Sequence, residues 1–380
     1  MRMDRVPAGY QTLDAWRGIA ILMVMMFHAC APAIGSQFPE LAHAPFYTLC
    51  LHGGLGVTLF FVISGYCIAS AAVRVLVRDS TPVRGFVRSR ISRIYPPYAI
   101  ASLIGLLVIF AAKLLVARHV VSHSYLAGQL TQRPSLLFVL TSLTLTQEAF
   151  NQDNILPTGW SLCYETAFYA IFAAALAVEA ARKQSGIMLF LLNALTCLSV
   201  AWILISPASC PYPLGLWPLF GLGILCYSLL HVEDRRASAP LAAIAIAGLL
   251  ACAIWGRTTG GAHGVSREQI TCGLLFATLV IWLYRWDSWI AGQAAVKSLA
   301  KIGVFSYSLY LIHMFLFGIV YQLGKKLHLA AGNFWISYLA QIACALLAGY
   351  IFFWCVEVRT ISKGRRRSVA TSLTAASPAE

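Results

Sequence analysis

The chain has 380 residues, of which 59% are hydrophobic and only 11% are charged, and its mean hydropathy is +0.74. Soluble domains carry roughly a quarter of their residues as charged side chains, so this composition excludes a soluble globular protein. The net charge of +14 comes from basic residues that lie between apolar runs, which is typical of cytoplasmic loops rather than of a nucleic-acid-binding surface.

The first apolar run is preceded by basic residues, and its end, Ala29-Cys30-Ala31, resembles a signal-peptide cleavage site. We expect the run to remain as a membrane helix, because a discarded segment has no use for the Arg17 and His28 side chains inside it. The 11 cysteines are scattered without a CxxC pair or zinc-ligand spacing, so the sequence predicts neither a disulfide framework nor a metal site.

A membrane-spanning helix needs about 20 mostly apolar residues. Segments of this kind recur throughout the chain and predict an all-α integral membrane protein, a single bundle of about ten transmembrane helices. The candidate spans are 15–35, 52–73, 94–116, 158–180, 187–206, 213–230, 239–256, 268–285, 302–323 and 333–356. The run 134–147 is shorter and Thr-rich, so we expect a re-entrant or interfacial segment on the outer side, while the role of 117–157 stays open.

Ten spans place both termini on the same side of the membrane. If the N-terminus is cytoplasmic, most of the 28 Lys and Arg residues fall in cytoplasmic segments, as the positive-inside rule requires. We therefore predict cytoplasmic N- and C-termini, a transmembrane domain over 1–356, and a basic cytoplasmic tail over 357–380 that is expected to be disordered.

Two ionisable side chains lie inside the first span. Arg17 and His28 are eleven residues apart, which is about three helical turns, so both are expected on one face, about 16 Å apart along the axis. Polar side chains at membrane depth usually face the bundle interior and mark a pathway or site. The structural alternative is that Arg17 reaches the lipid headgroups and His28 is a hydrogen-bonded core residue.

The second span and the basic stretch after it carry weaker signals. Glycines around Ser64 allow either a functional break or simple close packing of helices. Arg90 and Arg93 are i,i+3 neighbours whose guanidinium groups suit the phosphates of a cytoplasmic donor such as coenzyme A. Contact with anionic lipids explains the same charges equally well.

The fourth span begins with Trp160-Ser161-Leu162 and contains Glu165 about one turn inside its outer end. Intramembrane carboxylates are expensive, so a functional role is the first hypothesis and a structural hydrogen bond is the alternative. Tyr169, four residues later, is its expected partner.

The ninth span places Ser306, Tyr310 and His313 on one helical face. This polar stripe indicates either a site or a packed hydrogen-bond network inside the bundle.

At these positions the chain resembles the acyltransferase-3 family of bacterial integral-membrane O-acyltransferases. The matching features lie in order along nearly the whole bundle: the Leu13–Gly18 opening with Arg-x10-His (Arg17, His28), the Gly56–Gly65 segment, Arg90-x-x-Arg93 before Tyr95-Pro96, Trp160-Ser161-Leu162 leading to Glu165, and Ser306–Tyr310 leading to His313. Two departures leave a second carboxylate role open, because Thr58 stands where many relatives carry Asp, and Thr166 where some carry a second acid.

The resemblance implies an acyl-CoA donor, most commonly acetyl-CoA, and a carbohydrate or glycolipid acceptor modified on the outer side of a bacterial inner membrane. We assign catalysis to His28 and Glu165, with His28 as general base, and donor binding to Arg17, Arg90 and Arg93 at the cytoplasmic mouth. Supporting roles are assigned to Asp14, Ser64, Trp160, Tyr169, Tyr310 and His313. Direct transfer and a covalent acyl-enzyme both stay open, although no G-x-S-x-G motif indicates a serine nucleophile.

Two other classes of function fit a polytopic chain. A transporter or flippase for a polysaccharide precursor or small anion often shows inverted repeats and paired broken helices, and neither is evident in the sequence. A non-catalytic lipid-binding scaffold has no need of ionisable side chains along one helix face. The acceptor sugar, the acyl chain length and the oligomeric state are not encoded in any pattern that we recognise.

Overall fold

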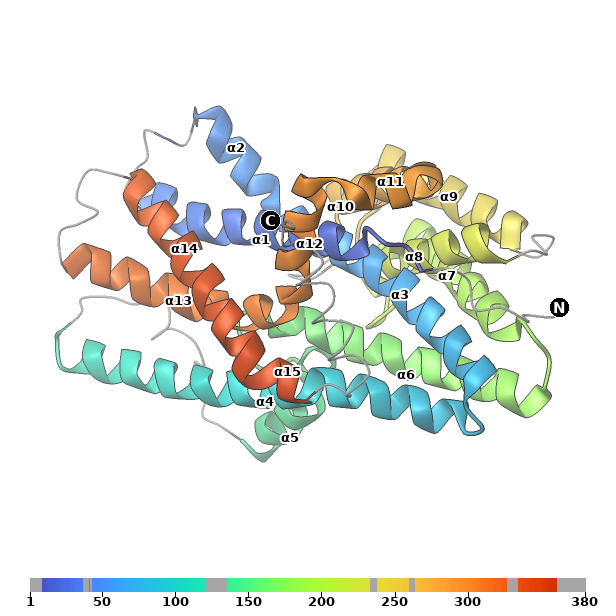
Figure 1. Cartoon of the computed structure of the whole chain (residues 1–380), viewed down its shortest axis with the longest axis horizontal. Coiled ribbons are helices and arrows are strands. Elements are labelled where there is room, and N and C mark those ends of the chain that lie inside the picture. The colour runs from blue at the N-terminus through green and yellow to red at the C-terminus, as the bar shows by residue number, and fades with distance from the viewer. Residues whose placement is uncertain are drawn as a thin grey trace, which may run out of the picture. The chain divides into compact units, whose positions relative to one another are not determined.

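The computed structural model describes residues 9–36, 41, 43–120, 135–232, 238–259, 264–326 and 334–360. Every regular element in these ranges is helical (Figure 1). The longer helices are α1 (Leu13–Ser36), α3 (Gly56–Arg78), α4 (Pro82–Ala117), α6 (Gly159–Arg182), α7 (Ile187–Ile205), α8 (Trp217–His231), α9 (Ser238–Trp255), α10 (Arg267–Leu283), α13 (Ser306–Lys326) and α14 (Phe334–Phe352). The shorter ones are α2 (Pro45–Leu51), η2 (His52–Leu55), α5 (Leu136–Thr144), η4 (Gln147–Phe150), η5 (Pro207–Ser209), η6 (Tyr284–Trp286), α11 (Asp287–Gly292), α12 (Ala294–Val304), the π-helix η7 (Phe353–Glu357) and α15 (Val358–Thr360).

Nine helical stretches within the described ranges are long and apolar enough to cross a membrane. They coincide with nine of the ten predicted spans. The tenth prediction, 213–230, falls on α8, which has 15 residues and is shorter than a typical span. Nearly all of α8 is buried in protein, so its apolar composition reflects a core helix that is covered on every side.

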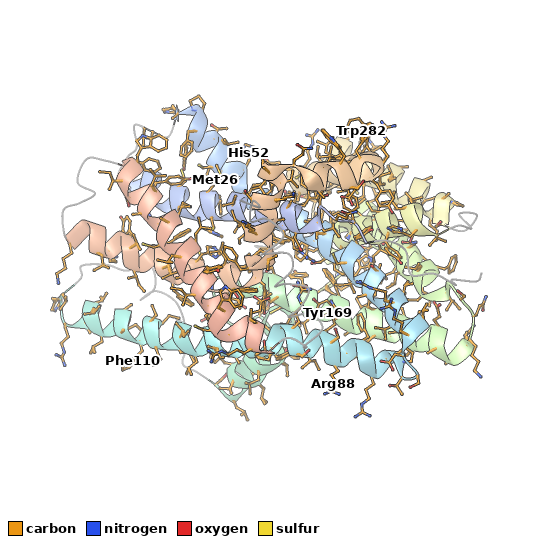
Figure 2. The ribbon with its side chains drawn as sticks, in the orientation of Figure 1. Met26, His52, Arg88, Phe110, Tyr169 and Trp282 are labelled. Atoms are coloured by element: carbon orange, nitrogen blue, oxygen red, sulfur yellow. The ribbon has the colours of Figure 1, made fainter. Side chains whose placement is uncertain are left out.

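Large apolar side chains remain exposed on the long helices. Phe110 on α4 is 70% exposed and Trp282 on α10 is 53% exposed, and both are labelled in Figure 2. Water would disfavour so many exposed apolar groups, whereas hydrocarbon tails would not. Burial therefore agrees with composition that this chain folds in a lipid environment.

Helix α4 starts earlier than the span predicted at 94–116. It begins at Pro82, where the missing N–H of proline costs nothing, and it continues through Pro96 and Pro97. The basic residues up to Arg93 are therefore helical, since arginine is a good helix former. This extension fixes Arg90 and Arg93 on one continuous helix.

The chain divides into two compact units, each built from segments that are distant in sequence. Unit 1 comprises Met1–Leu13, Val57–Ile91 and Cys163–Val296. Unit 2 comprises Asp14–Gly56, Ser92–Leu162 and Lys297–Glu380.

Unit 1 is organised around α8, which packs against α7 and α10. Helices α3 and α8 cross with their backbones almost in contact, because a Cβ at Gly65 would overlap the carbonyl oxygen of Phe220, and one at Gly223 would overlap that of Val62. Glycine at both positions permits this crossing. Gly65, next to Ser64, thus has the packing role that was the structural alternative from the sequence.

Unit 2 contains the antiparallel neighbours α13 and α14, which pack extensively against each other (Figure 1). The apolar run predicted as re-entrant or interfacial forms the nine-residue α5, too short to span a membrane. Tyr95 and Tyr98 of α4 hold this helix by donating hydrogen bonds to the carbonyl oxygens of Thr144 and Ser142, each at 3.1 Å. Of the segment whose role was left open, residues 121–134 lie outside the described ranges.

The residues just before α1 are held in unit 1 by the buried Asp287 carboxylate, which accepts hydrogen bonds from the backbone N–H groups of Gln11 and Thr12 and from the Thr12 hydroxyl at 2.8 Å. Hydrogen bonds to a charged group are stronger than neutral ones. We expect Asp287→Asn to lower the free energy of unfolding by about 1–3 kcal/mol. Thermal unfolding in detergent tests this, with the exposed Glu268→Gln as control; equal melting temperatures for the two variants would contradict it.

The predicted tail boundary lies inside a helix. The chain stays helical through Thr360, and Glu357, the first residue assigned to the tail, is only 4% exposed. The remaining tail residues, 361–380, lie outside the described ranges, and their predicted disorder stays a prediction.

Candidate functional site

Helix α1 carries both ionisable residues of the first span on one uninterrupted helix. Asp14 and Arg17 form an i,i+3 ion pair, with 2.6 Å between Nη1 and Oδ1, and the arginine side chain is 16% exposed. The carboxylate orients the guanidinium but neutralises part of its charge. Arg17 is therefore a held, mostly buried cation rather than a mobile surface arginine.

The second ionisable residue of α1, His28, lies against another histidine. His28 Nδ1 lies 3.2 Å from Nε2 of His313 on α13, a residue 285 positions away in the sequence. The ring centroids are 5.2 Å apart, and Phe27 packs edge-on against His28 at 5.0 Å. We call His28 and His313 the histidine pair.

His313 is fully buried, and its other ring nitrogen is also engaged. Nδ1 lies 3.1 Å from the carbonyl oxygen of Leu309 and 2.9 Å from that of Tyr310. Carbonyl oxygens only accept hydrogen bonds, so Nδ1 of His313 carries a proton and donates it. The rings of Tyr310 and Phe317 enclose the imidazole, with centroids 5.9 and 5.5 Å away.

Tyr310 joins the histidine pair to the start of α6. Its hydroxyl lies 2.7 Å from the Ser161 hydroxyl, and its carbonyl oxygen accepts a hydrogen bond from the Thr158 hydroxyl at 3.2 Å. The Trp160-Ser161-Leu162 motif and the ninth-span motif thus meet through residues that are 149 and 152 positions apart in the sequence. Of the predicted supporting residues, Tyr310 and His313 are part of this network, and Trp160 is half-buried beside it in the chain.

A second group of predicted site residues lies in unit 1. The Tyr169 hydroxyl donates a 2.6 Å hydrogen bond to Glu165 Oε1, so the expected i+4 pairing is confirmed. The Arg90 guanidinium carbon lies 5.8 Å from the Tyr169 ring centroid and 5.6 Å from that of Phe86, so two aromatic rings flank the cation. We call Arg90, Tyr169 and Glu165 the arginine cluster; Tyr169 is labelled in Figure 2.

The arginine cluster brings together two residues that were assigned different roles from the sequence. Arg90 was expected at the cytoplasmic mouth and Glu165 in the outer part of its span, yet Tyr169 contacts both side chains. The reason is the early start of α4, which carries Arg90 along α6 instead of leaving it in a loop. Arg90 and Glu165 are therefore both neighbours of Tyr169.

Three other residues singled out in the sequence have simpler surroundings. Arg93 is half-buried on α4, three residues after Arg90, and Ser64 is half-buried next to the glycine crossing of α3 and α8. Thr58 is fully buried, and Gly273 of α10 lies against its methyl group. Threonine at 58 therefore fills a packed position where a carboxylate would have to be accommodated.

One polar pair was missed from the sequence. The Ser308 hydroxyl donates a 2.6 Å hydrogen bond to Glu357 Oε2, and both side chains are buried. Glu357 lies in the π-helix η7, a geometry found often at functional positions. The signal was a single carboxylate directly after the apolar run Phe352–Val356, which the predicted tail boundary hid.

The described side chains thus supply a paired imidazole, an arginine paired with a carboxylate, an arginine flanked by aromatic rings, and a hydrogen-bonded carboxylate. Imidazole is suited to general-base chemistry, and the guanidinium groups to phosphate oxygens. Among the residues that the structure describes, no group of three or more His, Cys, Asp or Glu side chains is placed to hold a metal ion.

Comparison with known proteins identifies the class. A family model described as an acyltransferase domain, that of the acyltransferase-3 family, matches residues 10–356. The exopolysaccharide production protein ExoZ of Rhizobium meliloti (strain 1021) is 28% identical over 325 residues, which cover 84% of this chain and 93% of the relative. No solved structure matches the chain. Since the family model spans almost the whole sequence and every one of the ordered motifs, the protein belongs to the acyltransferase-3 family of membrane acyltransferases.

Proposed function

We propose that the protein is an O-acyltransferase that moves an acyl group, acetyl in the first instance, from cytoplasmic acyl-CoA to a sugar hydroxyl of an extracytoplasmic or lipid-linked polysaccharide. The observation that carries the proposal is the histidine pair: within a chain of the acyltransferase-3 family, the histidine of the Arg-x10-His motif has its ring held by a second, buried imidazole. A ring fixed in this way suits proton transfer better than a merely structural role.

The donor side of the proposal uses the three arginines. Arg17, Arg90 and Arg93 bind the phosphates of the donor, in a bacterial inner membrane with both chain termini in the cytoplasm. The flanking rings of Arg90 and the Asp14 carboxylate on Arg17 support this role, because both reduce the freedom that an arginine loses on binding.

The acceptor side rests on the family and on chemistry. ExoZ is named for exopolysaccharide production, and we extend this to a carbohydrate acceptor here. Glu165, oriented by Tyr169, supplies a carboxylate that binds sugar hydroxyls. Carboxylates are acceptors that suit the several hydroxyl donors of a sugar.

The reaction balances without any further group. His28 removes the proton from the acceptor hydroxyl as its oxygen attacks the thioester carbonyl carbon. The carbon–sulfur bond breaks, the coenzyme A thiolate leaves, and the imidazolium returns the proton to that sulfur. The products are the sugar ester and free coenzyme A.

A reconstituted assay tests the proposal. Purified protein in liposomes is given acetyl-CoA and polysaccharide from a deletion strain, and the polysaccharide is examined by NMR. The expected result is a new ester on one sugar position, identical to the ester that the parent strain has and the deletion strain lacks. Proton-coupled uptake of a solute with no acylated product would favour a transporter and overturn the proposal.

The donor role of Arg90 has a separate test. Arg90→Gln keeps much of the side-chain volume and removes the cation, so we expect KM for acyl-CoA to rise about tenfold or more while kcat changes little. Arg285→Gln is a matched control, because Arg285 also lies over aromatic rings, 3.8 Å from the Trp286 centroid, but has no proposed role. Equal donor KM values in both variants would remove Arg90 from donor binding.

A further inference from the structure

We infer that His313 is a positioning residue that holds His28 in a single tautomer, with the proton on Nδ1 and the lone pair on Nε2. Nε2 of His28 is then the atom that removes the acceptor's proton. This inference rests on the proposed acyl transfer and adds the identity of the basic atom and of the residue that selects it.

The surroundings of His313 determine which of its ring nitrogens carries the proton. Its Nδ1 faces two backbone carbonyl oxygens, at 3.1 and 2.9 Å, so Nδ1 must be the protonated nitrogen. The groups bonded to this fully buried ring are those carbonyls and the ring of His28, and no charge among them compensates for a buried imidazolium. His313 is therefore neutral, and its Nε2 is a hydrogen-bond acceptor.

The unprotonated Nε2 of His313 in turn restricts where His28 carries its proton. Because Nε2 of His313 has a lone pair and no proton, the 3.2 Å contact is a hydrogen bond only if Nδ1 of His28 donates. A neutral imidazole has one proton, so the Nε2 of His28 is left with its lone pair. The carbonyl oxygen of Val24 on α1 is a further hydrogen-bond partner of the His28 ring, so the backbone of α13, acting through His313, contributes to the choice of the basic nitrogen and does not decide it alone.

The hydrogen bond between His28 and His313 also affects the proton transfer itself. When Nε2 of His28 takes the proton from the hydroxyl, the ring becomes an imidazolium whose Nδ1–H still donates to His313. The hydrogen bond is stronger to the charged ring than to the neutral one, so it stabilises the transition state more than the ground state. His313 thus performs for His28 the orienting task that a carboxylate performs in many catalytic triads.

One of the two carbonyl groups that accept a hydrogen bond from His313, that of Tyr310, is itself held in place. The carbonyl oxygen of Tyr310 also accepts a hydrogen bond from the Thr158 hydroxyl at 3.2 Å, and the Tyr310 hydroxyl contacts Ser161 at 2.7 Å. These contacts fix the turn of α13 that sets the proton on His313. The Trp160-Ser161-Leu162 motif therefore contributes to the tautomer of His28 through Tyr310, without touching the histidine pair itself.

Two substitutions of His313 separate positioning from packing. In His313→Gln the amide oxygen reaches the place of Nε2 and can accept from His28 Nδ1, whereas His313→Leu fills a similar volume without an acceptor. We expect kcat to fall about 10–100-fold in the leucine variant and less than about fivefold in the glutamine variant, with donor KM unchanged in both. His52→Gln is the matched control, because exposed His52 also directs Nδ1 at the carbonyl oxygen four residues earlier, at 2.7 Å, and has no assigned role.

A double mutant and a spectrum complete the test. If His313 acts only through His28, His28→Ala combined with His313→Leu has the same residual activity as His28→Ala alone. With ¹⁵N-labelled histidine, the signals lost in His28→Gln should be those of a neutral ring protonated on Nδ1, and they should change in His313→Leu.

Each outcome has a defined meaning. Equal activity in the glutamine and leucine variants at equal thermal stability, or an Nε2-protonated His28, overturns the inference but leaves the acyl transfer intact. An active His28→Ala protein removes His28 from the mechanism and overturns the inference with it, whereas a wild-type protein that forms no ester overturns the proposed function.

Discussion

Replacement of His28 by alanine is expected to reduce acyl transfer by about 10²–10⁴-fold, the largest effect on activity of any substitution that leaves the fold intact. The substitution removes the only imidazole that the Arg-x10-His motif supplies, and it leaves Nε2 of buried His313 without its partner. Donor binding should change little, since the arginines are untouched. Ester formation at saturating acyl-CoA measures the loss in kcat.

Two controls make the result interpretable. Expression, membrane insertion and melting temperature of the variant should match those of the parent, and His52→Ala should retain full activity because His52 is exposed at the end of α2. Retained acylation in a correctly inserted His28→Ala protein would remove His28 from the mechanism.

The largest effect on stability is expected at the crossing of α1 and α12 in unit 2. A Cβ on Gly303 would overlap the carbonyl oxygen of Asp14, and one on Gly18 would overlap that of Leu299. These obstacles are backbone atoms on helices, which cannot rotate away as a side chain can. We expect Gly303→Ala to destabilise the protein by about 1–3 kcal/mol and Gly303→Leu to prevent folding.

The same substitution should affect the donor site, because Asp14 holds Arg17 through the 2.6 Å ion pair. In Gly303→Ala we expect a lower melting temperature together with a raised KM for acyl-CoA. Gly292→Ala is the control, since no atom lies within 4 Å of the position of its added Cβ. Equal melting temperatures in the two alanine variants would show that the helices separate at little cost.

Much of the fold could be predicted from the sequence because membrane insertion depends on local quantities. Hydropathy and length over about 20 residues identify a span, and they located nine helices that are long and apolar enough to cross a membrane. The same measure cannot distinguish a lipid-facing span from a helix enclosed in protein. This is why α8, apolar on every side and only 15 residues long, also looked like a span.

Part of the candidate site could also be predicted, where its residues share one helix. The Glu165–Tyr169 hydrogen bond was predicted from i,i+4 spacing. The ion pair between Asp14 and Arg17 was not predicted, although its i,i+3 spacing is compatible with one. Spacing within a helix fixes neighbours to within one turn, whatever the rest of the chain does.

The sequence by itself therefore determined that this is a helical membrane protein and which polar side chains stand out in its spans. Only the tertiary structure decided their partners: His313 for His28, Tyr169 for Arg90 and Ser308 for Glu357. The physical reason is that partners on different helices depend on how the helices cross, and crossings depend on small residues such as Gly303 that carry no hydropathy signal.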